Sequence, residues 1–334
     1  MADNILKATE LTGILGRSEF DKLSKIHGND WINYRSDYNK ASELELLDFP
    51  IQLDIELNAS CNLKCPMCPI SAESPNGKGK STWFPFEFFQ QIINYAVKNG
   101  TKALKLNYVN EPLIRNDLYK FIDYAKKSGI LDVYLSTNGV LMTEKFINQF
   151  IDLGLTRLQV SIDATTDEVY NQMRPGGSYE KVINNINNFL KIKKERSAFL
   201  PILRVNFVKT ELNEHQLEEF ISLWKEKVDM IGIQEFIKPT KSIIEIKSKK
   251  SIKKDSINFK CSFPFKQLVI TNEFDVLPCC TFWGEELSLG KLKQPEDLKL
   301  FWNSLKIKHL REIHKKGQYH SVHQCKECVE GGVS

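Results

Sequence analysis

Six short runs of aliphatic and β-branched residues, separated by stretches with helical spacing, constrain the fold of this chain more than any other feature. The runs cover residues 51–57, 103–109, 132–137, 157–162, 202–208 and 230–236. After the first run, Phe89, Ile92 and Ala96 lie on one helical face, and the glycine at position 100 follows as a stop signal. Strands that alternate with helices in this way predict right-handed βαβ units and a parallel sheet covered by helices.

The number of units limits the shape of that sheet. Six units over about 190 residues are fewer than the eight of a closed (β/α)8 barrel. We therefore predict an α/β fold with a partial, TIM-like (β/α)6 barrel over residues 51–237. Residues 1–50 are mixed and charged, and they form an N-terminal extension to which we assign no role.

Residues 238–260 interrupt the alternation, because they are rich in Lys, Ser and Ile without a hydrophobic period. The basic run 247–254 has two interpretations, a nucleic-acid patch or a solvated linker. No aromatic residue is interleaved in it, which favours the basic linker. Beyond it, residues 266–271 and 274–277 predict a hairpin and residues 296–314 a helix, so that residues 261–334 form a small second domain.

Composition and charge are those of an ordinary globular chain. Of its 334 residues, 42% are hydrophobic and 26% charged, which provides enough apolar side chain for a sizeable core. The net charge of +4, from 46 basic and 42 acidic residues, gives no strong field toward nucleic acid or membranes. We therefore expect the chain to bind neither nucleic acid nor membranes. Because no apolar stretch has the length of a membrane span or a signal core, we also expect a cytoplasmic protein.

Cysteines carry the strongest functional signal. Cys61, Cys65 and Cys68 form a triplet, and five more cysteines follow between positions 261 and 328. In a reducing compartment, clustered cysteines bind metal more often than they form disulfides. Two separate metal sites are the simplest interpretation.

The triplet has the spacing CxxxCxxC and follows the first predicted strand directly. Three thiolates on one such loop can hold three irons of a cubane cluster, which leaves the fourth iron open to a substrate or cofactor. A zinc knuckle, the alternative, requires a fourth Cys or His close by, and the next 40 residues contain neither. We therefore interpret Cys61, Cys65 and Cys68 as ligands of an iron–sulfur cluster.

With this loop on a six-unit βα domain, residues 51–236 resemble the radical S-adenosylmethionine (SAM) enzymes. Asn110, Glu111 and Pro112, after the second run, are similar to the family's Gly-Gly-Glu-Pro segment, which receives the SAM amino group, although both glycines are replaced. The segments 136–139, at the end of the third run, and 161–163, at the end of the fourth, resemble other SAM-contacting segments of the family. The resemblance implies SAM-binding roles for Glu111, Ser136, Asn138, Ser161, Asp163 and Arg174.

The resemblance also implies a reaction. One-electron reduction of SAM by the cluster gives methionine and a 5′-deoxyadenosyl radical, which removes a hydrogen atom from the substrate. The electron comes from a reductant such as flavodoxin or ferredoxin. Arg174 is the implied partner of the SAM carboxylate, which a guanidinium fork suits. The other implied SAM contacts lie at the carboxyl ends of predicted strands, where α/β folds place their ligand sites.

Four of the remaining cysteines are Cys261, Cys279, Cys325 and Cys328, at spacings of 18, 46 and 3 residues. Taken alone, this set fits zinc as well as it fits a cluster. The segments FDVLPCC and CKEC resemble the SPASM/twitch extension, which carries auxiliary [4Fe–4S] clusters. Because six residues follow Cys328, we expect the shorter twitch form with one auxiliary cluster, hence two [4Fe–4S] clusters in all. Four thiolates close that cluster, which favours electron transfer over substrate binding.

Cys280 stands beside Cys279 and is not needed as a ligand. One interpretation is a small buried residue. The other is a thiol that donates a hydrogen atom to the substrate radical, which makes the product an epimer. His320 and His323 lie near Cys325, and we interpret them as surface residues because four cysteines already suffice for the auxiliary site.

Three functions compete. The first is oxidation or epimerisation of a carbohydrate-type small molecule, namely an amino-sugar, an aminocyclitol or a nucleotide sugar. The twitch-type aminocyclitol dehydrogenases resemble this cysteine plan. The second is a maturase that modifies a peptide or protein, which usually carries a leader-binding domain longer than the 50 residues that precede Ile51. The third, a metal-binding module without activity, requires the strand-end motifs to be coincidental. We expect the first.

Overall fold

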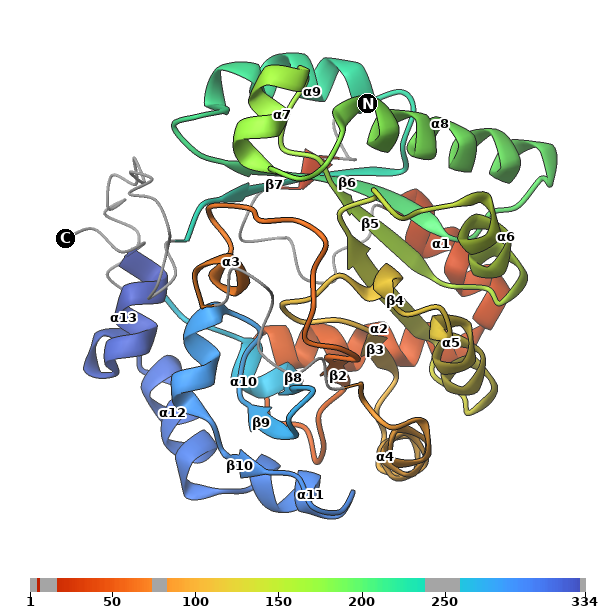
Figure 1. Ribbon diagram of the computed structural model, residues 1–334. Helices are drawn as coiled ribbons and strands as arrows, with labels where there is room; N and C mark the ends of the chain where they lie inside the picture. The colour runs from red at the N-terminus through yellow and green to blue at the C-terminus, as the bar shows by residue number, and fades with distance from the viewer. Residues whose placement is uncertain (1–4, 7–16, 74–82, 238–258, 331–334) are drawn as a thin grey trace.

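The structure is a computed structural model that describes residues 5–6, 17–73, 83–237 and 259–330 (Figure 1). A sheet of ten strands runs through it in the order β1-β7-β6-β5-β4-β3-β2-β8-β9-β10. All neighbours from β1 to β8 in that order pair in parallel, and β8, β9 and β10 pair antiparallel. The strands are β1 (Ile5–Leu6), β2 (Gln52–Ile55), β3 (Ala103–Lys105), β4 (Asp132–Thr137), β5 (Arg157–Ser161), β6 (Ile202–Lys209), β7 (Met230–Glu235), β8 (Gln267–Ile270), β9 (Asp275–Leu277) and β10 (Gly290–Lys291).

Helices follow the strands of the barrel and cover its outer face (Figure 1). These helices are α4 (Phe86–Lys98), α5 (Leu118–Lys127), α6 (Glu144–Asp152), α7 (Asp167–Met173), α8 (Tyr179–Glu195) and α9 (Leu217–Trp224). The short α3 (Pro69–Glu73) instead packs its Ile70 with Tyr108 and Val269. Strands β2 to β7 each start within one residue of a predicted run, which confirms the six units and the partial barrel. No helix among the described residues is long and apolar enough to cross a membrane.

The two faces of the barrel sheet differ in chemistry. Leu53, Val133 and Leu158 are fully buried in one apolar core together with the helices outside the barrel. The alternate positions on the same strands face inward, because successive side chains of a strand point to opposite faces. They are mostly polar or charged, and include Gln52, Asp54, Lys105, Tyr134, Arg157, Gln159, Arg204 and Asn206. Buried parallel sheets are usually apolar on both faces, so the polar inner face indicates a ligand site.

The N-terminal extension is part of the barrel. Helices α1 (Arg17–His27) and α2 (Asn29–Ser42) carry Leu23, Trp31 and Tyr38 into a core with Ala103 and Met230, which lie at the amino ends of strands β3 and β7. Strand β1 pairs with β7 and lengthens the sheet at that edge. The extension therefore closes the end of the barrel opposite the strands' carboxyl ends.

The C-terminal segment continues the same sheet. The predicted hairpin is confirmed as β8 and β9, and β8 also pairs in parallel with β2. The predicted single helix at 296–314 is wrong, because α11 (Asp297–Trp302) ends before Ser304, which caps a separate α12 (Leu305–Lys315). Helices α10 (Phe263–Lys266) and α13 (His323–Glu330) complete the segment. Most of the predicted basic linker, 238–258, lies outside the described residues.

Candidate iron–sulfur and S-adenosylmethionine site

Cys61, Cys65 and Cys68 lie on the loop that leaves the carboxyl end of β2. All three are free thiols, Cys65 is buried, and the Cys68 amide donates to the Cys65 carbonyl oxygen at 3.0 Å. Burial raises the pKa of Cys61 and of Cys65 to about 12. The negative charge of the next cysteine along the loop adds to the rise of each pKa. Without a metal the thiols hold their protons, so iron binding must displace them. The nearby Arg174 guanidinium lowers both pKa values and favours that step.

Arg174 begins a turn that packs on the cysteine loop. The carbonyl oxygen of Pro175 accepts a hydrogen bond from the Lys64 amide at 3.1 Å. Arg174 also forms a buried ion pair with Asp163, at the end of β5. Asp163 has a left-handed φ of 64°, a strained conformation for a residue other than glycine, and strain of this kind clusters at functional sites. The Arg174 Nε atom is buried and has no hydrogen-bond partner within the described ranges.

Glu111 connects three loops at this edge of the sheet. Its buried carboxylate accepts hydrogen bonds from the Leu113 amide at 3.0 Å, the Thr137 hydroxyl at 2.7 Å and the Asn138 amide at 2.8 Å. Burial raises the pKa of Glu111, and these three donors oppose that rise. A carboxylate offers about four acceptor positions, so about one is left for a ligand.

The remaining implied SAM contacts lie around the same edge. The Asn138 side-chain amide donates to Asn62 Oδ1 at 2.9 Å and lies 3.9 Å from Cys61 Sγ. The Ser136 hydroxyl donates to Gln159 on the inner face at 2.9 Å, and Ser161 closes β5 half-buried. The structure thus brings Glu111, Asn138, Asp163 and Arg174 to the cysteine triplet, whereas Ser136 and Ser161 lie on neighbouring strands facing the barrel interior.

The four other predicted ligands converge at a second site. Burial raises the pKa of Cys261, and the charges of Cys279, Cys328 and Cys325 add to that rise, so these three thiols lie within electrostatic range of Cys261. Gly284 allows a tight approach, because a Cβ there would stand 3.1 Å from Cys279 Sγ. His320 and His323 are exposed. Among the described residues, no three His, Cys, Asp or Glu side chains lie close enough together to hold a single metal ion.

Cys280 has other main neighbours than that set. It packs on an apolar patch that includes Tyr108, Val269 and Leu277, against the inner side of the barrel. After burial, which raises the pKa of Cys280 to about 12, the strongest influences on this thiol are the charges of Asp54 and Lys105. Cys280 is therefore a protonated thiol at neutral pH, at the barrel interior.

Polar residues of the inner face are the part of the site that the cysteine motifs did not indicate. Asp54 is buried, which raises its pKa to about 6, and it accepts a hydrogen bond from Gln52 at 2.6 Å. Arg204 donates to Asn206 at 2.7 Å and to Gln159 at 3.2 Å, and burial lowers its pKa to about 9. The signal was present in the sequence, because these residues alternate with aliphatic ones inside the predicted strands.

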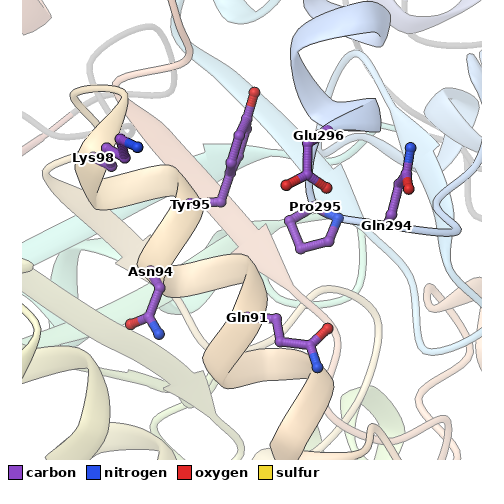
Figure 2. Close-up of a pocket in the computed structure, with 7 residues that line it drawn as sticks. All are labelled: Gln91, Asn94, Tyr95, Lys98, Gln294, Pro295 and Glu296. Carbon is purple, nitrogen blue, oxygen red and sulfur yellow. The ribbon is translucent and has the colours of Figure 1, made fainter.

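A groove on the outer surface is unrelated to this chemistry. Figure 2 shows it between α4 and the turn before α11. It is lined by Gln91, Asn94, Tyr95, Lys98, Gln294, Pro295 and Glu296. No cysteine or implied SAM contact lines it, so the candidate site is the cysteine edge of the barrel.

Comparison with known proteins agrees with this geometry. The model of the radical SAM superfamily matches residues 55–223, and that of the SPASM iron–sulfur cluster-binding domain matches residues 261–329. A probable GTP 3′,8-cyclase from Methanocaldococcus jannaschii is 31% identical over 185 residues, which are 55% of this chain and 58% of that protein. The chain thus spans little more than half the length of this curated relative.

Two solved structures share the fold. BtrN in complex with AdoMet and 2-DOIA aligns with a TM-score of 0.51 and 17% identity, over 84% of this chain and 93% of BtrN. Streptococcus suis SuiB bound to precursor peptide SuiA aligns with a TM-score of 0.61 and 16% identity, over 84% of this chain and 71% of SuiB. At these identities the likeness shows the fold alone.

Proposed function

The chain belongs to the radical SAM superfamily, and we propose that it abstracts a hydrogen atom from a carbohydrate-type small molecule to give an oxidised or epimerised product. The radical SAM domain binds SAM and a [4Fe–4S] cluster, and the SPASM domain binds auxiliary iron–sulfur clusters. Reductive cleavage of bound SAM supplies the group that removes the hydrogen atom. We assign this chemistry to a core of residues 51–237 and the auxiliary cluster to residues 261–334.

The cofactor site is assigned to named residues. Cys61, Cys65 and Cys68 hold the SAM-binding cluster, and Cys261, Cys279, Cys325 and Cys328 hold a single auxiliary cluster. For SAM, the buried Nε of Arg174 is an unused donor beside the triplet and fits an anionic carboxylate. Glu111, Asn138 and Asp163 hold the surrounding loops in place, and Ser136 and Ser161 complete the predicted contacts from the inner face.

The polar inner face is the observation that carries the substrate class. Side-chain amides of Gln52, Gln159 and Gln267, with Asp54 and Lys105, line the barrel below the cysteine edge. A sugar or cyclitol presents hydroxyl and amino groups over its whole surface, so it needs many such partners. An apolar peptide side chain has no donors or acceptors to match this polar lining, so it fits the lining less well.

The names of similar proteins indicate two substrate classes, small molecules and peptides. The curated relative is named for a nucleotide, GTP, and SuiB was crystallised with a peptide. A peptide or protein maturase is therefore the alternative function. The two classes of substrate differ in size, so fractions of a cell extract separated by size distinguish them.

We expect a small-molecule fraction of cell extract to stimulate 5′-deoxyadenosine formation above the uncoupled background. The assay uses anaerobically reconstituted protein with SAM and a reductant such as flavodoxin or ferredoxin. Stimulation by the peptide fraction alone would make the maturase the better assignment. Formation of no deoxyadenosine under any condition would contradict the enzymatic proposal as a whole.

Cys280 decides between the two product types. Transfer of its thiol hydrogen to the substrate carbon radical forms a C–H bond and breaks the S–H bond. The resulting thiyl radical regains the thiol by taking one electron from the reductant and one proton from solvent. Because the Cys280 thiol packs on the apolar patch at the inner side of the barrel, we assign it this donor role, which predicts an epimerised product.

Replacing Cys280 by Ala or Ser is expected to leave deoxyadenosine formation intact and to remove the epimer. Serine keeps the size and polarity of the side chain, but its stronger O–H bond does not donate a hydrogen atom readily. The products are identified by mass spectrometry in deuterated water, where the wild-type enzyme incorporates one deuterium from the exchanged thiol. An unchanged yield of the same labelled product from both variants would exclude Cys280 as the donor.

A further inference from the structure

Tyr170 presents a buried hydroxyl that nothing in the described part of the chain satisfies. It lies on α7, its side chain is fully buried, and its hydroxyl oxygen has no hydrogen-bond partner among the described residues. A buried tyrosine hydroxyl usually finds a partner, and an exception in a native protein calls for an explanation such as an absent ligand.

The hydroxyl lies where two loops of the site meet. A Cβ on Gly177 would stand 2.7 Å from the Tyr170 hydroxyl oxygen, so the glycine leaves room for it beneath the turn that begins at Arg174. The same turn accepts the Lys64 amide hydrogen bond from the cysteine loop, and a Cβ on Gly176 would lie 3.6 Å from the Asn62 carbonyl oxygen. The hydroxyl is thus next to the triplet loop and sealed from solvent.

The charges around the hydroxyl agree with this position. Burial raises the pKa of Tyr170 to about 12, so the hydroxyl keeps its proton and acts as a donor. Among the negative groups that add to this rise, Cys65 has the largest effect, ahead of Asp163 and Glu111. The Arg174 guanidinium opposes the rise, so it also lies near the hydroxyl.

We propose that the Tyr170 hydroxyl donates a hydrogen bond to a sulfur of the cluster held by Cys61, Cys65 and Cys68, at the corner that Cys65 occupies. This inference rests on the assignment of the triplet under the proposed function. Tyr170 is a positioning residue that tunes the cluster. Hydrogen bonds to cluster sulfurs raise the reduction potential, because the donor's partial positive charge stabilises the more negative reduced form.

This role differs from that of Arg174. The guanidinium is charged and forked, which suits the carboxylate of SAM. The tyrosine hydroxyl is neutral and single, which suits a sulfur that must remain bound to iron. The Tyr170 hydroxyl and the Arg174 Nε atom both lack hydrogen-bond partners among the described residues, and we assign them to two neighbouring acceptors.

Tyr170→Phe removes the hydroxyl and keeps the ring that packs in the core. The holoenzyme is titrated with reductant, and the electron paramagnetic resonance signal that changes shape on SAM addition reports the triplet cluster. We expect the midpoint potential of this signal to become more negative, with the Kd for SAM unchanged. A fluorotyrosine at position 170, whose more acidic hydroxyl donates more strongly, is expected to shift the potential in the opposite direction.

Tyr179→Phe is the matched control. Its ring lies 5.8 Å from that of Tyr170, but its pKa responds to Glu219 and Asp167 rather than to any cysteine. This variant should keep the wild-type potential. A Tyr170→Phe protein with an unchanged potential overturns the proposal, whether SAM affinity falls, which assigns the hydroxyl to SAM, or stays the same. A wild-type protein without any SAM-responsive cluster would instead contradict the proposed function.

Discussion

Alanine at Cys61, Cys65 and Cys68 together is expected to abolish 5′-deoxyadenosine formation and to lower the iron content from about eight to about four atoms per chain. The three thiols lie on one loop after β2, beside the unused Arg174 donor, and we assign them all the protein ligands of the SAM-binding cluster. Without them no iron remains where SAM is cleaved. Iron is measured by colorimetry after anaerobic reconstitution, and deoxyadenosine by liquid chromatography.

The matched control is alanine at Cys261 and Cys325. These two cysteines belong to the second group of thiols, so the variant should lose a similar amount of iron. It should nevertheless keep the uncoupled deoxyadenosine formation, because that step needs only the triplet cluster. If the triplet variant retained the wild-type iron content, the triplet would not be a cluster site. Equal loss of deoxyadenosine in both variants would show that the two sites do not act separately.

Asp132→Ala is expected to lower the free energy of unfolding by about 3–5 kcal/mol, because it leaves a buried guanidinium without its carboxylate. Asp132 is fully buried and accepts two hydrogen bonds from Arg157, at 2.9 and 2.8 Å. It also accepts the Tyr34 hydroxyl of the N-terminal extension at 2.9 Å. Chemical denaturation under anaerobic conditions measures the change as a shift in midpoint at constant slope.

Three further variants test the cause. Tyr34→Phe removes one hydrogen bond and keeps the ion pair, so it should cost about 1.5 kcal/mol. The double variant Asp132→Leu with Arg157→Met removes both charges and should recover most of the loss. Asp123→Ala breaks an exposed pair with Lys127, 2.8 Å long, and should cost under about 1 kcal/mol. A loss for Asp132→Ala as small as that of Asp123→Ala would contradict the burial argument.

The strands of the barrel could be predicted from sequence because their signal is local. Aliphatic runs and helical spacing are properties of neighbouring residues, and β4 covers the predicted residues 132–137. Helix α4 ends near Gly100, which adopts a φ of 104° as the stop signal implied. The two cysteine groups were recognisable for the same reason, since a ligand loop is defined by short spacings.

The conformation of the hairpin turn could not be predicted from the local sequence. Phe274 adopts a left-handed φ of 68°, a conformation that favours glycine. Its ring packs against Phe84 at 5.2 Å and Phe88 at 5.4 Å between ring centroids. Contacts with residues nearly two hundred positions away thus stabilise a backbone conformation that the local sequence disfavours.

The sequence by itself determined the six βα units, the partial barrel and the two cysteine groups, because spacing and periodicity act over a few residues. Only the tertiary structure decided that the N-terminal extension closes the barrel through Tyr34 and Asp132, and that β8 extends the sheet beside β2. It also gave Cys280 neighbours on the inner side of the barrel, namely Tyr108, Val269 and Leu277. These outcomes depend on packing between distant segments, and Tyr170 became a candidate only once that packing left its hydroxyl buried without a partner among the described residues.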